Sequence, residues 1–372
     1  MKILHIIPNL LKGGAERLVL DICIELQTHD NIHVQLITFS ESNEYRELTN
    51  KVNHHVVTSR FHPSISGKSS KDVKDLQIYI SNFKPDVIHS HLWESEMVLS
   101  QIKSDAKWFS HFHDNMSQLR KIKLPFSKKD ITDSFEKRMV LKSYSNKNVN
   151  FICISKYTMS YAKKVLPKPL LRNINLIHNG IDFDHFYSPV KAIKADLTLI
   201  NIGSFVKKKN QKLAIEIVAH LIKNEISCEL ILLGDGPLKV DLIEYARQLN
   251  ISDQVQFMGN VDNVAKHLSK ASVYLHTALS EPFGLVLLEA MAAGLPVVSL
   301  DGKGNRDIIK NNINGYIITN QSIESFSRAI INLSKEKELS INIAKKGQRT
   351  AKKYDIKNYG KQLLKLYKES IS

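Results

Sequence analysis

The chain has 372 residues, of which 43% are hydrophobic and 24% charged, and its formal net charge is +15. This length predicts two domains, and no run approaches the roughly 20 apolar residues of a membrane-spanning helix. The positive charge calls for an anionic partner, but no nucleic-acid-binding motif accompanies it, so we expect no nucleic acid. The three cysteines are isolated and predict neither a disulfide nor a zinc site.

Short apolar stretches alternate with amphipathic helical stretches along the chain. In the first half we predict a helix over 14–27 and strands at 3–7, 33–39, 87–90, 108–112 and 151–154. After Ser188-Pro189 the pattern restarts, with strands at 197–202, 229–233, 255–258, 273–276 and 297–299 and helices near 210–223, 238–249, 285–293 and 322–333. Such alternation is typical of parallel sheets covered on both faces. It predicts an α/β protein with two Rossmann-like domains, and the last helical stretch, 358–370, fits either domain.

Three glycine features follow predicted strands, at the edge where open α/β sheets bind ligands. They are Gly13-Gly14, Gly203-Ser204 with the lysines at 207–209, and Gly234-Asp-Gly236-Pro, which we interpret as a strand-to-helix turn. A lysine beside a helix start is a natural counter-charge for a phosphate. None of the three is the Gly-x-Gly-x-x-Gly fingerprint, which argues against a nicotinamide dehydrogenase.

Histidines gather in His89-Ser-His91 and His111-Phe-His113-Asp114. In a strand His111 and His113 share a face, so metal ligation is conceivable. A metal site needs a third donor, and Asp114 points to the other face. We therefore expect no metal, and we expect His113 to be a polar group facing a cleft. His89 and His91 fit structural roles equally well.

The most specific segment is Glu281-Pro-Phe-Gly284, which leads into a predicted helix. A helix start offers free N–H groups that suit a phosphate. Glu281 lies just outside this anion site. Glu289 lies one turn into the helix, on the same face as Leu285. A nucleotide-sugar, whose diphosphate separates two hydroxylated rings, fits this layout. The alternative is a buried helix with two exposed acids.

Seven motifs in this order resemble those of the group 1 (family 4) retaining glycosyltransferases with the GT-B fold. The motifs lie at 13–17, 84–91, 113–114, 178–182, 203 with 209, 234–237 and 281–289. The resemblance covers about residues 1–355 and implies two Rossmann-like domains facing a central cleft. It implies an N-terminal acceptor-binding domain over 1–186, a C-terminal nucleotide-sugar-binding domain over 187–354, and a helix at 355–372 that packs back on the first domain.

The resemblance assigns the donor site to the C-terminal domain. Glu281 would hold hydroxyls of the transferred sugar, and Glu289 would hold the ribose hydroxyls. Lys209 would neutralise the diphosphate. The diphosphate would bind the amides of Gly284, Leu285 and Val286.

Other roles fall on the glycine loops and on one histidine. Gly13 and Gly14 would let the N-terminal domain close on the phosphates and sugar, and His113 would face the sugar near the reacting centre. Ser204 stands where the family usually has an arginine. The candidates to replace that arginine are Lys207, Lys208 and Lys209.

The resemblance implies a metal-independent transfer, with retention of anomeric configuration, from a nucleotide-diphosphate sugar to a saccharide or lipid-linked saccharide. We prefer a UDP-sugar as donor and bacterial surface polysaccharide synthesis as the setting. No Asp-x-Asp metal motif is evident near the expected cleft, and no cofactor is expected. A nucleotide-sugar epimerase of the same two-domain architecture is the alternative, since it needs no acceptor; a non-catalytic sugar-nucleotide binder is less favoured.

A basic stretch suggests a membrane surface. Its charged residues are Arg120, Lys121, Lys123, Lys128, Lys129, Lys137 and Arg138, interleaved with Leu124, Phe126, Ile131, Phe135 and Met139. This pattern predicts a cytoplasmic enzyme that docks on anionic lipids at the inner membrane face. A solvated basic face is the alternative.

Overall fold

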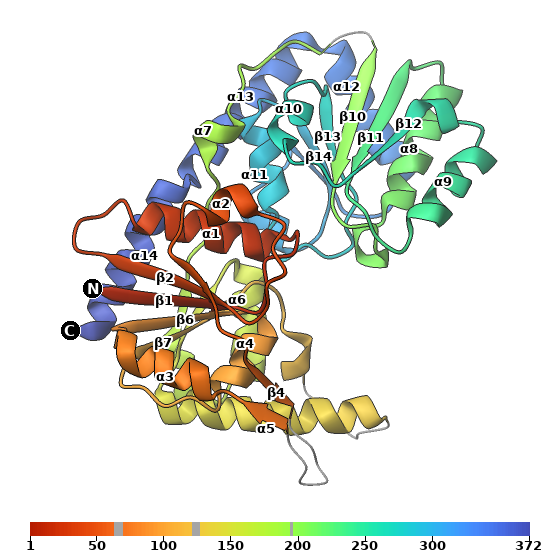
Figure 1. Ribbon diagram of the computed structural model, residues 1–372. Coiled ribbons are helices and arrows are strands. Elements are labelled where there is room, and N and C mark those ends of the chain that lie inside the picture. The colour runs from red at the N-terminus through yellow and green to blue at the C-terminus, as the bar shows by residue number, and fades with distance from the viewer. Residues whose placement is uncertain (63–69, 121–126, 194–195) are drawn as a thin grey trace. The chain divides into compact units, whose positions relative to one another are not determined.

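In the computed structural model the protein forms two compact units. Unit 1 comprises Met1–Gly180 and Ile356–Ser372, and unit 2 comprises Ile181–Asp355 (Figure 1). The structure describes residues 1–62, 70–120, 127–193 and 196–372. The expected boundary at 186/187 lies just after this division, because helix α7 (Phe183–Phe186) contacts α11 (Leu285–Ala292) of unit 2.

Within the described residues, unit 1 is built on a seven-stranded sheet in the order β3-β2-β1-β6-β7-β8-β9. All its strand pairs are parallel. The central strand, β6, is buried along its whole length, as expected of a parallel sheet with helices on both faces, although it carries His89 and His91. The strands are β1 (Lys2–Ile7), β2 (His33–Thr38), β3 (His54–Val56), β6 (Val87–His91), β7 (Lys107–Phe112), β8 (Asn150–Cys153) and β9 (Ile174–Leu176). A separate antiparallel pair joins β4 (Arg60–His62) to β5 (Ser70–Asp72).

The last helix of the chain belongs to unit 1. It packs on α1, and a Cβ added at Gly360 would lie 2.6 Å from the side-chain Cγ of Glu25. The helices of unit 1 are α1 (Gly14–Leu26), α2 (Arg46–Thr49), α3 (Lys74–Phe83), α4 (Leu92–Leu99), α5 (Lys128–Lys147), α6 (Lys156–Val165) and α14 (Ile356–Ile371).

Unit 2 carries a parallel sheet of six strands among its described residues, in the order β12-β11-β10-β13-β14-β15. They are β10 (Leu197–Ile202), β11 (Cys228–Leu233), β12 (Val255–Gly259), β13 (Val273–His276), β14 (Val297–Leu300) and β15 (Tyr316–Ile318). Besides α7 and α11, its helices are α8 (Gln211–Lys223), α9 (Lys239–Gln248), α10 (Val264–Leu268), α12 (Ile323–Lys335) and α13 (Lys337–Lys353). This is the Rossmann order, so the α/β prediction is confirmed.

Each sheet reverses its strand order once, between β1 and β6 in unit 1 and between β10 and β13 in unit 2. Ligands of doubly wound sheets bind outside the carboxyl ends of the strands at such a reversal. The predicted site residues all lie near these two places. The sequence missed β3, β9 and β15 because three-residue strands are too short to show a period.

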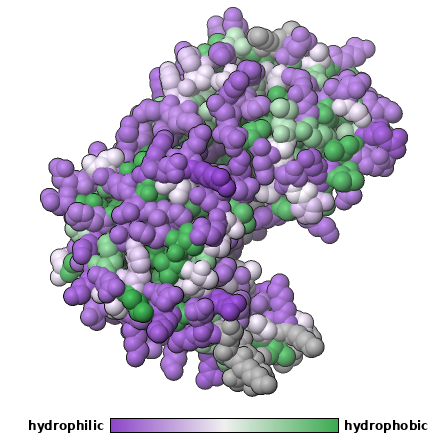
Figure 2. All heavy atoms as spheres, in the orientation of Figure 1, coloured by the Kyte–Doolittle hydropathy of each residue, from purple (hydrophilic) through white to green (hydrophobic). Residues whose placement is uncertain are grey.

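The face of the molecule drawn in Figure 2 is mainly polar. Hydrophilic residues cover most of the face in Figure 2, and hydrophobic ones form small separate patches there. Among the described residues, no helix has both the length and the apolar character needed to cross a membrane.

Candidate functional site

In unit 2, a buried ion pair occupies the point just after β13. Glu281 is 7% exposed, and its Oε2 lies 2.7 Å from Nζ of Lys209 and 3.3 Å from Nε2 of His276. Burial alone would raise the pKa of the Glu281 carboxyl. Lys209 and His276 outweigh burial and hold that pKa well below its usual range. Glu281 is therefore an anion at neutral pH, and His276 is a site residue that the sequence analysis missed.

A glycine loop holds the backbone of Glu281. The Glu281 N–H donates to the carbonyl of Gly302 at 2.9 Å, and the Gly304 N–H donates to the carbonyl of Glu281 at 3.0 Å. A Cβ at Gly304 would lie 2.0 Å from the Pro282 carbonyl oxygen, so only glycine fits. This loop was also missed, although a Gly-x-Gly after the predicted strand at 297–299 was a usable signal.

The start of α11 has the geometry expected of an anion site. Its N-cap, Gly284, is left-handed with φ at 105°, and a Cβ there would lie 2.6 Å from Cδ1 of Leu287. The first amides of a helix have no intrahelical acceptor. The structure thus places the predicted amides of Gly284, Leu285 and Val286 at a helix start beside Glu281.

Glu289 lies one turn into α11 and is partly exposed. Burial raises the pKa of the Tyr274 phenol, and the charges of Glu281 and Glu289 raise it further. Both predicted carboxylates therefore act on the same buried ring of β13, which puts them in one neighbourhood.

A second glycine turn presents Lys209. Gly203 has φ at 151°, and a Cβ on Gly234 would lie 2.3 Å from the Gly203 carbonyl oxygen. The buried Gln211 amide donates to the carbonyls of Gly203 and Ser204 at 3.2 and 3.1 Å and fixes the turn. The Ser204 side chain is exposed, as are Lys207 and Lys208. Of the three candidate lysines, Lys209 is the one paired with Glu281.

In unit 1, five histidines line one face of the sheet at the reversal between β1 and β6. They are His5 on β1, His89 and His91 on β6, His111 on β7 and His113 just after it. His5 is paired in register with His89, and His91 with His111. The His111 and His113 rings stack with centroids 4.1 Å apart, and those of His89 and His91 are 4.4 Å apart.

Hydrogen bonds link four of these rings to specific partners. His5 Nδ1 is 2.9 Å from His91 Nε2, and His91 Nδ1 is 2.8 Å from His113 Nε2. His89 Nδ1 instead meets the hydroxyl of Tyr367 on α14 at 2.5 Å. His113 is the partly exposed member of the row, while the other four are fully buried.

Burial keeps these imidazoles neutral. It lowers the pKa of His5 and of His111 to about 3, and it holds the pKa values of His89, His91 and His113 well below the usual range. Neighbouring histidines add to the effect on each of these except His111, whose pKa the side chain of Asn179 acts to raise.

The assumption that a third donor is missing near His111 and His113 was wrong. Ring nitrogens of His91, His111 and His113 lie within 4.8 Å of one another, and His5, His89 and His91 form a second such group. The donors come from neighbouring strands, which the spacing within one strand cannot reveal. Asp114 instead accepts the Met116 N–H at 2.8 Å. The absence of a metal remains a prediction.

The loop before α1 is tied to a neighbouring segment. The Tyr45 hydroxyl accepts the Gly13 N–H at 3.1 Å and donates to the Gly13 carbonyl at 3.0 Å. The Lys12 N–H donates to Glu44 at 2.7 Å. Gly13 itself is extended, and Gly14 begins the helix. Glu44 and Tyr45, which hold this loop, carried no signal in the sequence.

Two family models together match residues 12–350 of the chain. The model described as "Glycosyl transferases group 1" matches residues 185–350, and the model "Glycosyltransferase Family 4" matches residues 12–185. The chain belongs to this glycosyltransferase family.

Relatives of this chain carry names that describe different activities. It is 32% identical over 155 residues to N-acetyl-alpha-D-glucosaminyl L-malate synthase of Bacillus anthracis, covering 42% of this chain and 40% of the relative. It is 30% identical over 205 residues to the lipopolysaccharide core biosynthesis glycosyltransferase LpsE of Rhizobium meliloti (strain 1021), covering 54% and 59%. The chain thus spans about half the length of these relatives.

The fold of the family extends over the whole chain. The crystal structure of Anabaena HepE in complex with UDP and glucose matches with a TM-score of 0.79 at 18% identity, covering 99% of both chains. This likeness confirms the GT-B fold class for the two Rossmann-like units.

The family member also contains one Asp-x-Asp sequence, Asp182-Phe-Asp184, at α7. The Asp182 carboxylate accepts the His185 N–H at 3.1 Å and caps the helix. Asp184 lies 3.4 Å from Nζ of Lys352. Both carboxylates thus have partners within unit 2.

The basic stretch is partly engaged within unit 1. Arg120 pairs with Asp130 at 2.7 Å and with Asp133 at 3.2 Å, and Lys137 donates to the Arg120 carbonyl. Ile131 and Phe135 on α5 are 44% and 36% exposed. Residues 121–126, which include Lys121, Lys123, Leu124 and Phe126, lie outside the described residues.

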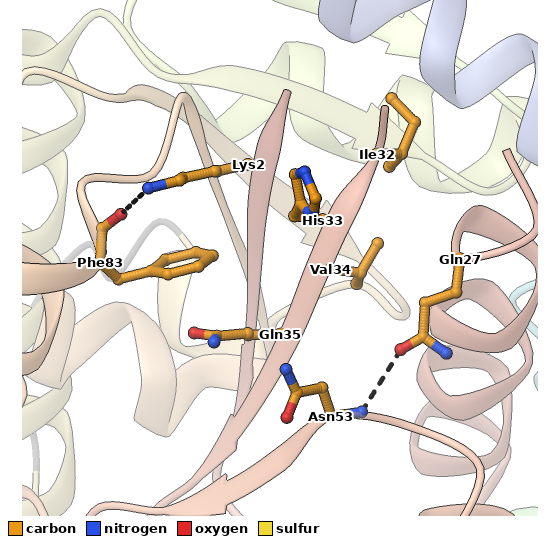
Figure 3. A pocket seen from close by; sticks show the side chains of 8 residues that line it. All are labelled: Lys2, Gln27, Ile32, His33, Val34, Gln35, Asn53 and Phe83. Atoms are coloured by element: carbon orange, nitrogen blue, oxygen red, sulfur yellow. Dashed lines mark hydrogen bonds between the residues drawn. The ribbon is translucent and has the colours of Figure 1, made fainter. Parts of the chain in front are cut away.

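A pocket of about 400 Å³ opens elsewhere in unit 1 (Figure 3). Lys2 and His33, which begin β1 and β2, line it, and Lys2 donates to the Phe83 carbonyl at 3.1 Å. It therefore lies at the amino ends of the strands. Ligands of this fold bind at the carboxyl ends, so we do not assign it to the candidate site.

Proposed function

We propose that this chain is a retaining, metal-independent glycosyltransferase. It transfers a sugar from a nucleotide-diphosphate sugar, preferably a UDP-sugar, to a saccharide or lipid-linked saccharide in bacterial surface polysaccharide synthesis. The observation that carries the proposal is the buried Glu281–Lys209 pair beside the start of α11, in a member of this family. The family and its relatives do not favour the epimerase alternative.

The ion pair and the start of α11 bind different parts of the nucleotide-sugar. A lysine ammonium has three donors, so Lys209 can hold Glu281 and a diphosphate oxygen together. The amides at the start of α11 take up the remaining phosphate charge. Glu281, ionised and fixed by its backbone contacts, accepts hydrogen bonds from sugar hydroxyls. Glu289 accepts them from the ribose.

The reaction exchanges one C–O bond for another. The bond between the anomeric carbon and the diphosphate breaks, and its electron pair leaves with the diphosphate. The acceptor oxygen bonds to the anomeric carbon on the same face, and its proton passes to the departing diphosphate. Lys209 and the helix-start amides stabilise the developing charge as preorganised donors.

These donors perform the charge neutralisation that a divalent metal supplies elsewhere. Asp182 and Asp184, the acidic pair of unit 2, are engaged as a helix cap and an ion pair. These contacts support a transfer that needs no metal.

Two features support the choice of substrates. HepE, the structural neighbour, was crystallised with UDP and glucose, which supports a UDP-sugar donor. LpsE is named for lipopolysaccharide core synthesis, which supports a lipid-linked saccharide acceptor.

A panel of nucleotides and nucleotide-sugars in a thermal-shift assay tests the donor site. We expect UDP and at least one UDP-sugar to raise the melting temperature, with and without a chelator. Mass spectrometry then detects transfer to saccharide and lipid-linked acceptors, and NMR of the product gives its anomeric configuration. Loss of activity on chelation, restored by a divalent ion, would overturn the metal-free mechanism. An inverted product would overturn retention.

We also propose that the enzyme is cytoplasmic and docks on the inner membrane face through α5 and the adjoining basic residues. The exposed Ile131 and Phe135 beside exposed Lys129 and Arg138 support this, since basic residues near an anionic surface add about 1 kcal/mol each. The internal pairing of Arg120 and Lys137 reduces the charge available.

Vesicle flotation at low salt tests the docking. We expect binding to anionic but not to neutral vesicles, reduced when Lys121, Lys123, Lys128 and Lys129 are changed to Glu. A control with the same change in charge replaces Lys223, Lys310, Lys335 and Lys345, which are exposed on unit 2. Equal loss in both variants, or no flotation at all, would overturn the docking proposal.

A further inference from the structure

We infer that His5 and His91 are positioning residues that hold His113 in one tautomer, with its single ring proton on Nδ1. His113 then offers an N–H donor, and not a base, to a ligand oxygen. This inference rests on the proposed function and on the role near the reacting centre that the family resemblance implies for His113.

The geometry is a chain of three imidazoles that crosses three segments of unit 1. His5 Nδ1 meets His91 Nε2 at 2.9 Å, and His91 Nδ1 meets His113 Nε2 at 2.8 Å. Both distances are those of hydrogen bonds. Each bond contains one proton between two ring nitrogens, so the tautomer of each ring fixes that of the next.

The direction of hydrogen-bond donation along these three rings is decided at His5. His5 Nε2 is fully buried and has no hydrogen-bond partner among the described residues. If the chain ran from His113 to His5, this nitrogen would carry a proton with no acceptor, and orphaned buried N–H groups are rare. The proton of His5 therefore lies on Nδ1 and is donated to His91. His91 in turn donates from Nδ1 to Nε2 of His113, which leaves the His113 proton on Nδ1.

The surroundings keep all three rings neutral, which the argument requires. Burial lowers the pKa of His5 to about 3 and holds the pKa values of His91 and His113 well below the usual range. A neutral imidazole has one donor and one acceptor. Only in that state does occupation of Nε2 determine what Nδ1 can do.

A bound metal ion is the competing explanation for clustered histidines. Ligand nitrogens around a tetrahedral zinc lie about 3.3 Å apart, because each Zn–N bond is about 2.05 Å. The His5–His91 and His91–His113 nitrogen–nitrogen distances, 2.9 and 2.8 Å, are shorter than that. His91 also uses both of its nitrogens in the chain, so it has none left for an ion.

The backbone beside His91 is itself unusual. Leu92, the next residue, has a left-handed conformation with φ at 67°. This conformation is unfavourable for leucine, and backbone strain of this kind concentrates at functional sites. The turn ends β6 directly after His91 and fixes the ring at the carboxyl edge of the sheet.

Nitrogen NMR of the full chain labelled with 15N-histidine tests the tautomer directly. The two ring nitrogens of a neutral histidine have distinct shifts according to which one carries the proton. We expect His113, assigned by loss of its signals in His113→Gln, to show the proton on Nδ1 at pH 7. A proton on Nε2, a charged ring, or Zn²⁺ bound stoichiometrically by these histidines would each overturn the inference.

Variants of His91 test the coupling. In His91→Asn the amide nitrogen replaces Nδ1 as donor to His113, whereas His91→Leu removes the donor. We expect His91→Leu to mix the tautomers of His113 and to lower kcat about tenfold with little change in KM, and His91→Asn to restore both. His89→Leu is the matched control. His89 is equally buried, but it is hydrogen-bonded to Tyr367 and not to His5, His91 or His113.

The two readouts separate the inference from the proposed function. The NMR measurement needs no substrate, so it tests the tautomer of His113 even if no nucleotide-sugar is turned over. If the wild type is active but His91→Leu and His89→Leu lose activity equally, with His113 unchanged in both spectra, His91 is merely structural and the inference fails.

Discussion

The two units use the same scaffold and fill its reversal point in opposite ways. In unit 2 the place after β13 holds a charged pair, Glu281 and Lys209, with a helix start beside it. In unit 1 the place where the strand order reverses, between β1 and β6, holds five neutral histidines. The contrast shows that strand order fixes where a site forms but leaves its electrostatics to individual side chains. Unit 2 offers a lysine and free helix-start amides at this place, and unit 1 offers neutral imidazoles.

The largest expected difference between the two units is in how far acid lowers their stability. Unfolded histidines take up protons below about pH 6.5, while folded His5 and His111 do so only near pH 3. Their contribution to stability is complete above pH 6.5 and is lost as the pH falls. Between pH 7 and 5 we expect each to cost unit 1 about 2 kcal/mol.

Hydrogen exchange of peptides from β1, β6 and β7, compared with β10 and β13 of unit 2, measures this difference. The pKa of Glu281 is depressed, so its contribution is present above about pH 4.5 and is lost only below that. Unit 2 contains one histidine with a lowered pKa among its described residues, His276. Equal acid sensitivity of both units would break the comparison.

Glu281→Gln tests the charge of unit 2 at the reacting centre. We expect kcat to fall by the equivalent of about 2–4 kcal/mol, because a charged hydrogen bond to the sugar is lost. Binding of UDP should persist, since Lys209 and the α11 amides remain. Steady-state kinetics and titration calorimetry measure the two effects. Glu244→Gln, which removes an acid paired with Arg247 on the surface, is the control. Near-normal turnover by Glu281→Gln would remove Glu281 from the site.

Lys209→Ala tests whether the pair acts as a unit. It leaves the Glu281 carboxylate buried without its cation, so we expect unit 2 to lose about 2 kcal/mol of stability, somewhat less than for a fully buried pair. UDP should bind more weakly, while uridine should not. Urea unfolding should show that adding Glu281→Gln restores part of the stability. Lys207→Ala and Lys208→Ala are controls, and a larger effect from either would show that Lys209 is the wrong lysine.

Glu289→Ala should give the smallest effect. Its carboxylate is partly exposed, so a lost hydrogen bond to ribose should cost about 1.5 kcal/mol, roughly tenfold in the Kd of UDP. Titration calorimetry measures this loss, and Glu289→Gln, which keeps one acceptor, should lose less. Unchanged affinity in a folded Glu289→Ala protein would make the residue structural.

The sequence predicted unit 2 better than unit 1 for a physical reason. The residues around Glu281 act through local geometry, since a turn, a helix start and an acid one turn later lie within one segment. The predicted start of that helix agrees with α11 (Leu285–Ala292). The ion pair itself was not predicted, because the strand-to-helix turn that carries Lys209 approaches Glu281 only in the folded sheet.

The histidine row depends on register between strands, which spacing along the chain does not contain. His5 and His91 are 86 residues apart and meet only because β1 pairs with β6. The same holds for Tyr45, which holds Gly13, and for the glycine loop under Glu281. Pairing registers are set by burial of whole strands, so no short motif reveals them.

The return of α14 to unit 1 has a consequence for synthesis of the chain. Unit 2 is continuous from Ile181 to Asp355, whereas unit 1 needs Ile356–Ser372, which the ribosome makes after all of unit 2. The hydroxyl of Tyr367 that completes His89 therefore arrives last. Until α14 is made, α1 lacks the helix that packs on it, and His89 and Phe109 lack their contact with Tyr367. Unit 1 can therefore complete its fold only after unit 2 has been made.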